Sequence, residues 1–336
     1  MLFLKLARKK LLEALKEFPE YSFYTPKKEG ERVLLKETSP DGLPEDLRFE
    51  RSTASAKELL FPQAETMFYF LRYKPSQKPV LDEGKRLILG LRPCDAHGIQ
   101  VLEANFLKVE PIDPYFKRRR ENTLLVTVAC LEFEDNCFCD SLGSGPDRLN
   151  GADAIIYDLN DAVGVLSNNE IISQRLKDYA FQIQEVRGED EVEKGSLPQR
   201  TVEPLPILSP EEYLSLILEE KLWDKISSTC LGCASCTYLC PTCYCFDIQD
   251  INYGPAGKRI RTYDSCMFNL YTLEASGHNP RPTLKERWRQ RFLHKFSYIP
   301  YLHGILGCTG CGRCIEVCPA GIDMREVIKD VAKFPR

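Results

Sequence analysis

The chain has 336 residues, of which 43% are hydrophobic and 28% charged, a composition typical of a soluble globular protein with two domains. Lys and Arg number 45 against 49 Asp and Glu, and this net charge of -4 gives no global attraction to nucleic acid or anionic lipid, so neither is expected as a partner. No run approaches the ~18 consecutive apolar residues of a membrane span, so we do not expect a membrane-spanning protein.

The first 18 residues, MLFLKLARKKLLEALKEF, have charges among their leucines and no small-residue cleavage site after them. This pattern predicts an amphipathic helix and not a signal peptide. Without a secretory signal we expect a cytoplasmic protein, whose 15 cysteines are kept reduced and are unsuited to disulfides. Metal binding is then the leading explanation for the cysteines.

Residues 1–209 alternate strand and helix patterns and predict an α/β domain. Segments 85–91 and 122–130 read as buried strands, and segment 152–167 reads as a strand, a turn and a strand. Between the first two strands we expect a helix with one apolar face formed by Ile99, Leu102 and Phe106.

Four cysteines of this domain follow predicted strands, at the end of the sheet where α/β proteins gather functional groups. Two stand at or just past the carboxyl ends of strands, and two lie in the loop CFCDSLGSGP. Our hypothesis is that a third iron-sulfur cluster, besides the two described below, binds to Cys94, Cys130, Cys137 and Cys139. The alternatives are a zinc site with four thiolate ligands and cysteines that pack as small hydrophobic residues.

The C-terminal part contains the pattern C-x2-C-x2-C-x3-C-P twice, at 230–241 and 308–319. This is the bacterial ferredoxin signature, in which the fourth cysteine of each run ligates the other cluster. The spacing predicts 4Fe-4S cluster I on Cys230, Cys233, Cys236 and Cys318. It predicts 4Fe-4S cluster II on Cys308, Cys311, Cys314 and Cys240.

Small residues between these cysteines let the backbone wrap a cluster closely and direct N–H groups at its sulfurs. They are Gly232, Ala234 and Ser235 in the first run and Gly310 and Gly312 in the second. Structural zinc is the alternative, but zinc requires neither a third cysteine at the same interval nor the Cys-Pro ending.

A long link separates the two runs, and its segment 282–298 has apolar residues every four positions. Thr283 and Glu286 form a capping box in front of them, which predicts a helix. We therefore expect residues 210–336 to form an α-helical ferredoxin domain with two 4Fe-4S clusters.

Other residues of this part allow more than one interpretation. Cys243, Cys245 and Cys266 could line cluster II, hold a further metal with a non-thiol ligand, or join the N-terminal cysteines. Segment 258–295 carries nine Lys or Arg, which could form a solvated face, favour the reduced state of a nearby cluster, or dock an acidic partner. The four histidines lack metal-ligand spacing from one another, and we expect packing or surface roles for His97, His278, His294 and His303.

These motifs together resemble the iron-sulfur electron-transfer subunits of anaerobic sulfite reductase and of sulfhydrogenase, where the beta subunit is of this type, a 4Fe-4S dicluster family. The resemblance covers nearly the whole chain. Its specific parts are RPCD at 92–95 and NCFCDSLGSGP at 136–146, and it extends to SCMF at 265–268 and GHNPRP at 277–282.

The resemblance implies an electron relay that links a catalytic subunit of hydrogenase, sulfite reductase or heterodisulfide reductase type to a flavin-containing NAD(P)H-type subunit. It makes a role for the four N-terminal cysteines more credible. We predict no catalytic residue and no substrate site in the chain itself. Two alternatives stay open, which are a self-contained redox enzyme using the N-terminal thiols and a structural adaptor stabilised by clusters.

Overall fold

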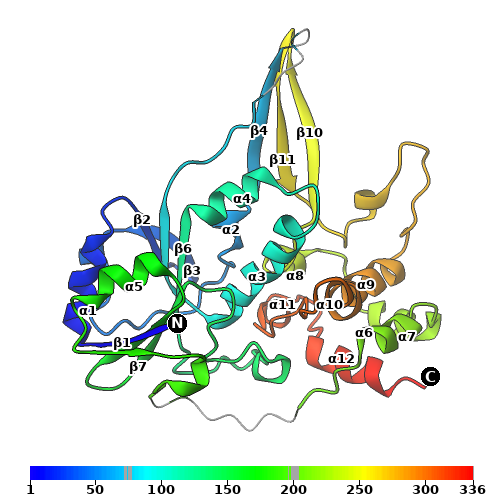
Figure 1. Cartoon of the computed structure of the whole chain (residues 1–336). Coiled ribbons are helices and arrows are strands. Elements are labelled where there is room, and N and C mark those ends of the chain that lie inside the picture. Colours follow the sequence, from blue (N-terminus) through cyan, green and yellow to red (C-terminus); the bar gives the residue numbers. More distant parts are fainter. Residues whose placement is uncertain (72–73, 75–77, 196, 198–203, 336) are drawn as a thin grey trace.

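The computed structural model describes residues 1–71, 74, 78–195, 197 and 204–335, and its largest element is an eight-stranded sheet in the N-terminal region (Figure 1). Its strand order is β3-β2-β5-β6-β7-β8-β1-β9. Strands β2, β5, β6 and β7 run parallel, and the other neighbours are antiparallel. The strands are β1 (Leu2–Leu6), β2 (Ser22–Glu29), β3 (Arg32–Thr38), β5 (Arg86–Leu91), β6 (Thr123–Val128), β7 (Ala154–Asp158), β8 (Val163–Ser167) and β9 (Gln182–Glu185).

Helices cover both faces of this sheet, as the burial of alternate strand residues requires. Helices α1 (Arg8–Ala14) and α5 (Glu170–Lys177) pack on one face, against residues such as Leu87 and Leu89. The opposite face, with Ile88 and Leu125, packs against α2 (Lys57–Leu60), α3 (Pro93–Leu107) and α4 (Pro114–Glu121). The predicted α/β character of the N-terminal region is confirmed.

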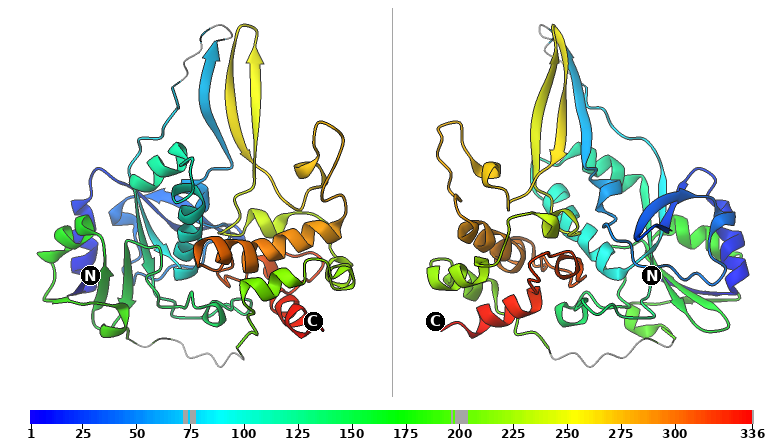
Figure 2. Two further views of the ribbon diagram at one scale, coloured as in Figure 1. Left: turned by 45° about the vertical axis from the view of Figure 1, so that its right-hand side comes forward. Right: turned by 180° about the vertical axis from the view of Figure 1, so that it is seen from behind.

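A second sheet of three strands projects from the rest of the molecule as an arm (Figures 1 and 2). It joins β4 (Ala64–Leu71) to the hairpin β10 (Phe246–Tyr253) and β11 (Ala256–Tyr263), all antiparallel. Glu65 on β4 accepts hydrogen bonds from Arg261 on β11 (2.7 Å) and Arg119 on α4 (2.6 Å). The two halves of the chain therefore share a sheet and a buried ion network, and the division at residue 209 stays a prediction.

Short helices make up most of the remaining C-terminal part around a second core. Trp223, Trp288, Phe292 and Phe296 lie at the centre of this core and are almost fully buried. The helices are α6 (Pro210–Ser215), α7 (Glu220–Ser227), α8 (Ser235–Tyr238), α9 (Leu284–Leu293), the π-helical turn His294–Tyr298, α10 (Ile299–His303), α11 (Arg313–Glu316) and α12 (Met324–Lys333).

Several local predictions can be compared directly with the structure. The capping box of Thr283 and Glu286 is present at the start of α9, as predicted. The predicted strands at 85–91, 122–130 and 152–167 are present within one to three residues. The helix predicted for residues 1–18 was wrong at its start, because residues 2–6 pair with β8 and β9 as strand β1.

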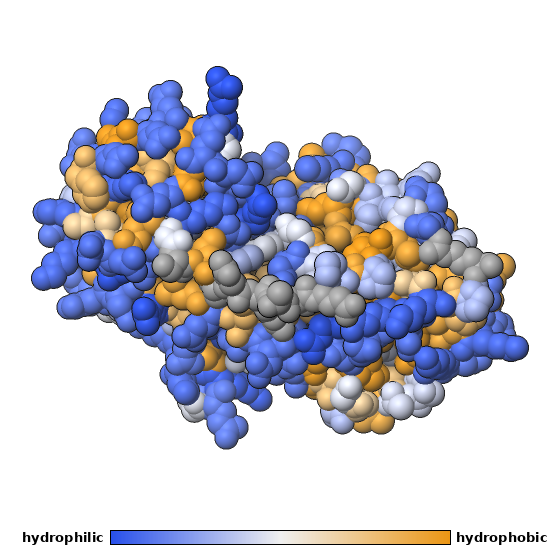
Figure 3. Space-filling model, turned by 90° about the horizontal axis from the view of Figure 1, so that it is seen from below, coloured by the Kyte–Doolittle hydropathy of each residue, from blue (hydrophilic) through white to orange (hydrophobic). Residues whose placement is uncertain are grey.

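Seen from below, the surface is mostly hydrophilic, with hydrophobic areas on both the N-terminal and C-terminal sides (Figure 3). Among the described residues, no helix has the length and apolar character needed to cross a membrane.

Candidate metal centre

The two cysteine runs fold as the same loop twice. In the first run Gly232 and Ala234 have φ angles of 66° and 63°, and in the second Gly310 and Gly312 have φ angles of 64° and 77°. A short helix follows each loop, α8 in the first run and α11 in the second. L-residues rarely adopt positive φ, so Ala234 holds an unfavourable conformation that its glycine counterpart adopts freely. The repeated loop conformation brings three cysteines of each run to one side.

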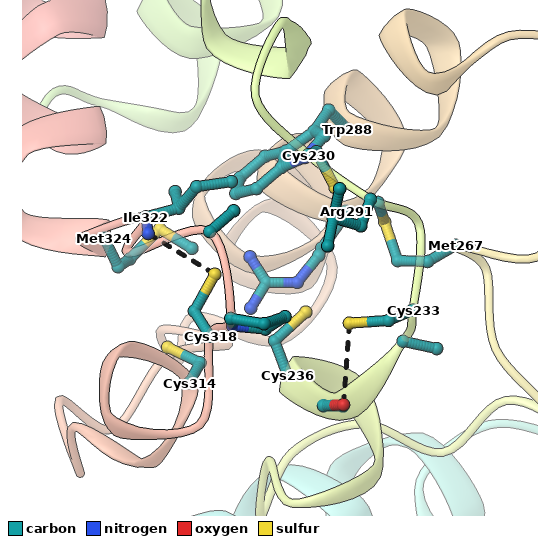
Figure 4. A pocket seen from close by; sticks show the side chains of 15 residues that line it. Cys230, Cys233, Cys236, Met267, Trp288, Arg291, Cys314, Cys318, Ile322 and Met324 are labelled. Atoms are coloured by element: carbon teal, nitrogen blue, oxygen red, sulfur yellow. Dashed lines mark hydrogen bonds between the residues drawn. The ribbon is translucent and has the colours of Figure 1, made fainter.

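The first cavity is lined by the four cysteines predicted for cluster I, which are Cys230, Cys233, Cys236 and Cys318 (Figure 4). It contains about 480 Å³ of space between atoms. Backbone N–H groups are directed at two of the sulfurs. Gly232 donates to Cys230 Sγ and Ile322 donates to Cys318 Sγ, each at 3.3 Å. Such bonds stabilise thiolates as ligands of a cluster.

The second cavity is lined by the four cysteines predicted for cluster II, which are Cys240, Cys308, Cys311 and Cys314. It contains about 320 Å³ of space, and Cys314 and Arg291 line both cavities. Burial raises the pKa of Cys308 to about 11. Each cavity thus draws three thiols from one run and the fourth from the other. The assignment of these thiols as cluster ligands stays a prediction that this arrangement supports.

The spacing of the thiols bears on the choice between clusters and zinc. Within the described ranges, no three Cys, His, Asp or Glu side chains come close enough together to hold one metal ion. Zinc needs four thiolates at about 2.3 Å from a single ion. The thiolates of a cubane bind separate iron atoms and stand further apart. The arrangement therefore fits iron-sulfur clusters better than zinc.

Two cationic side chains are buried beside these cavities. Lys295 Nζ lies 3.2 Å from Cys240 Sγ and 2.7 Å from Thr242 Oγ1. Burial opposes the charge on Lys295, but the adjacent Cys240 and Cys243 outweigh it and raise the pKa of the ammonium. Arg291 is also buried, and within the described structure its Nε and Nη1 have no hydrogen-bond partner. Figure 4 shows its side chain extending from α9 among the cysteine sulfurs.

Unpaired cations are costly to bury, because charge loses its hydration without a compensating partner. The residues that line the two cavities include no Asp or Glu. Thiolates and the anionic clusters that they hold are the counter-charges available to Arg291 and Lys295. The donor set therefore fits an anionic iron-sulfur group.

The four N-terminal cysteines also come together. Cys94 and Cys139 pack with Cys311 of the second cavity in a small buried group. The thiols of Cys137 and Cys139 are hydrogen-bonded to each other, and Cys130 lies close enough to feel the charge of Cys137. Burial raises the pKa of Cys130 to about 11. The structure thus places the predicted third group directly beside the second cavity.

The RPCD motif connects this group to the second cysteine run. Pro93 begins helix α3, which places Cys94 at the helix N-terminus, where the dipole favours a thiolate. Arg92 hydrogen-bonds the Cys130 thiol. Asp95 forms a buried, bidentate ion pair with Arg313 at 2.7 and 3.0 Å, and each side chain is only 1% exposed. Sequence reasoning missed this pair, although both residues stand beside cysteines in the motifs that it singled out.

Glycines allow the cysteine loops to approach one another closely. A Cβ on Gly310 would lie 2.6 Å from backbone atoms of Cys139, and one on Gly312 would lie 2.5 Å from the Asn136 carbonyl. The Phe138 N–H donates to the Gly310 carbonyl oxygen at 2.7 Å across this contact. These glycines therefore join the second cysteine run to the Cys-Phe-Cys loop as well as shaping their own turn.

The three cysteines outside these groups line a cavity of their own. This third cavity contains Cys243, Cys245 and Cys266, and none of them lines the second cavity. Of the four histidines, His294 lines the third cavity and His97 is buried on α3, while His278 and His303 are at least partly exposed.

Comparisons with known proteins agree with this arrangement. Residues 229–322 match the family model described as a 4Fe-4S dicluster domain. The protein named sulfhydrogenase 2 subunit beta, from Pyrococcus furiosus, is 32% identical to the chain over 295 residues, which cover 85% of each sequence. No solved structure gives a significant match.

Proposed function

We propose that this chain, which belongs to the sulfhydrogenase beta-subunit family, relays electrons between the catalytic subunit of an anaerobic oxidoreductase and its flavin-containing NAD(P)H-type subunit. The family and the dicluster domain make it an iron-sulfur electron-transfer subunit. A catalytic partner of hydrogenase, sulfite reductase or heterodisulfide reductase type suits such a relay. The relative is a subunit by name, and we extend that property to this chain.

One observation carries the proposal, namely two neighbouring cavities that are each lined by four cysteines. Clusters bound there supply one-electron transfer. The chain's own contribution is to hold the thiolates, direct backbone N–H groups at Cys230 and Cys318, and bury Arg291 and Lys295 beside them. Because positive charge stabilises the more negative reduced state, we expect these two cations to raise the reduction potentials.

We include the third cluster on Cys94, Cys130, Cys137 and Cys139 in this proposal. Two of its thiols pack against Cys311, so the group adjoins the predicted cluster II. The ion pair of Asp95 and Arg313 keeps the two loops together. This contact gives electrons a direct route between the α/β region and the dicluster domain.

The first cavity is the part of the relay nearest the surface. Cys233 is exposed, and its neighbour Leu231 is 68% exposed. A hydrogen bond from Ser235 lowers the pKa of the Cys233 thiol. We propose that a partner subunit docks at this loop and exchanges electrons there.

The alternative of a self-contained thiol enzyme has little support in the geometry. Cys94, Cys137 and Cys139 are buried, with exposed fractions of 6, 9 and 5%, so a substrate would not reach them. A relay needs no such access, since electrons pass through packed protein.

The crossed assignment of ligands can be tested with pairs of Cys→Ala variants. Cys318→Ala should remove about four irons. Combining it with Cys230→Ala should remove no more, because both thiols serve cluster I. Combining it with Cys308→Ala should remove about twice as many. Iron and sulfide analysis of anaerobically purified chain gives the result, and the opposite pattern would show that each run binds its own cluster.

The relay itself can be tested in the complex purified with its partner subunits. A Cys240→Ala complex should lose the reaction that couples nucleotide oxidation to the catalytic subunit. Each partner should keep its own activity with an artificial electron dye. A coupled rate equal to that of the unaltered complex would refute the relay.

A further inference from the structure

The third cavity resembles the two predicted cluster sites in its lining. Cys243 and Cys245 follow Pro241 closely, and Cys266 comes from the segment just after β11. The cavity contains about 300 Å³ of space, close to that of the second cavity. Three thiols from two separate segments thus converge on one buried space.

The sulfurs of this cavity are hydrogen-bonded as ligand thiolates are. Cys245 accepts hydrogen bonds from the Cys266 thiol, the Cys266 backbone N–H and the Tyr271 hydroxyl. A sulfur with three donors around it is suited to negative charge. Cys243 lies close enough to Cys266 to influence its ionisation.

The charge around the cavity also requires an anion. Arg291 and Lys295 line it, and its lining residues include no Asp or Glu. Lys57 is buried nearby, with its ammonium 3.0 Å from the Cys243 carbonyl oxygen. Three buried cations beside three thiols are better compensated by an anionic group with its thiolates than by neutral thiols.

We propose that Cys243, Cys245 and Cys266 hold a further iron-sulfur cluster, an inference that rests on the proposed electron-transfer function. Three thiolates leave one iron of a cubane for a non-thiol ligand, or suit a three-iron cluster. His294 and Tyr244 line the same cavity and offer non-thiol donors. Nitrogen donors replace thiolates in some iron-sulfur centres.

The position of this site gives it a place in the relay. The Cys243 thiol is hydrogen-bonded to Cys240, which lines the second cavity. The second cavity also shares Cys314 with the first cavity and borders the N-terminal group through Cys311. Predicted cluster II is therefore a junction with three neighbours, and the new site is the end of one branch.

Variants of one ligand test the proposal. Cys266→Ala should lower bound iron and sulfide by about four atoms each, and adding Cys245→Ala should cause no further loss. Cys308→Ala, in the second cavity, serves as the reference for losing one predicted cluster. If Cys308→Ala loses iron and Cys266→Ala loses none, this inference is wrong and the proposed function stands. If the unaltered chain holds no iron, the proposed function itself fails.

Native mass spectrometry of the unaltered chain gives an answer that does not depend on the folding of a variant. We expect a bound mass larger than that of the clusters on the other 12 cysteines by one further cluster. Cys243, Cys245 and Cys266 should resist alkylation until the protein is unfolded. A disulfide between Cys245 and Cys266, or alkylation of all three in the folded, iron-loaded chain, would overturn the proposal.

Discussion

Replacing Lys295 with methionine should lower the reduction potential of cluster II. The ammonium lies 3.2 Å from Cys240 Sγ, is 4% exposed, and has no carboxylate among its hydrogen-bond acceptors. Methionine keeps most of the side-chain volume and removes the charge. Reduction adds a negative charge that Lys295 stabilises, so losing the cation makes reduction harder.

The size of the effect follows from Coulomb's law. Allowing for the iron-sulfur bond beyond Cys240 Sγ, the ammonium stands about 7 Å from the centre of the added charge. At an effective dielectric constant of about 20, the interaction is about 2.4 kcal/mol. For one electron this corresponds to a shift of about 100 mV to lower potential.

The assay is a potentiometric titration followed by electron paramagnetic resonance. Lys295→Arg keeps the charge and should shift the potential by less than about 30 mV. Lys225→Met removes an exposed lysine on α7 and should leave the potential unchanged. An unchanged potential in Lys295→Met with intact clusters, or an equal shift in Lys225→Met, would refute the electrostatic reasoning.

Two further predictions concern the contacts that join the cysteine loops, and both are checked by the free energy of unfolding under anaerobic conditions. Gly312→Ala should cost at least about 2 kcal/mol more than Gly321→Ala. Both positions have positive φ, but only the Cβ at position 312 would meet backbone, 2.5 Å from Asn136, so equal losses would contradict this contact. Asp95→Asn should cost about 3–5 kcal/mol, because it leaves Arg313 charged and buried. Asp330→Asn breaks an exposed pair and should cost below about 1 kcal/mol, and a similar cost for both would show that burial of the first pair is unimportant.

The features predicted well from the sequence are those encoded locally. The capping box at Thr283 depends on residues three apart, and the strands near 85–91 and 122–130 are uninterrupted apolar runs. The cysteine runs carry their spacing in a dozen residues each, and the cavities bring together the thiols that this spacing predicts.

The features missed depend on distant partners. Residues 2–6 form a strand because β8 and β9 supply its hydrogen bonds, and the same apolar residues would suit a helix. The hairpin 246–263 completes a sheet with β4, which precedes it by most of the chain. Two distant cysteine motifs each contain one member of the pair Asp95 and Arg313, so neither motif reveals it alone.

The third cavity could not be predicted from the sequence for a similar reason. Cys243 and Cys245 follow the first run, and Cys266 follows β11, with no spacing that matches a known motif. The turn of the hairpin returns the chain to its starting point and so brings Cys266 to Cys245. Only the folded hairpin makes this group visible.

Analysis of iron, zinc and acid-labile sulfide in the anaerobically isolated chain tests the central claim most directly. We predict iron and sulfide in equal amounts, at least about eight of each per chain, and little zinc. Zinc bound to the cysteines with no inorganic sulfide would contradict the presence of clusters.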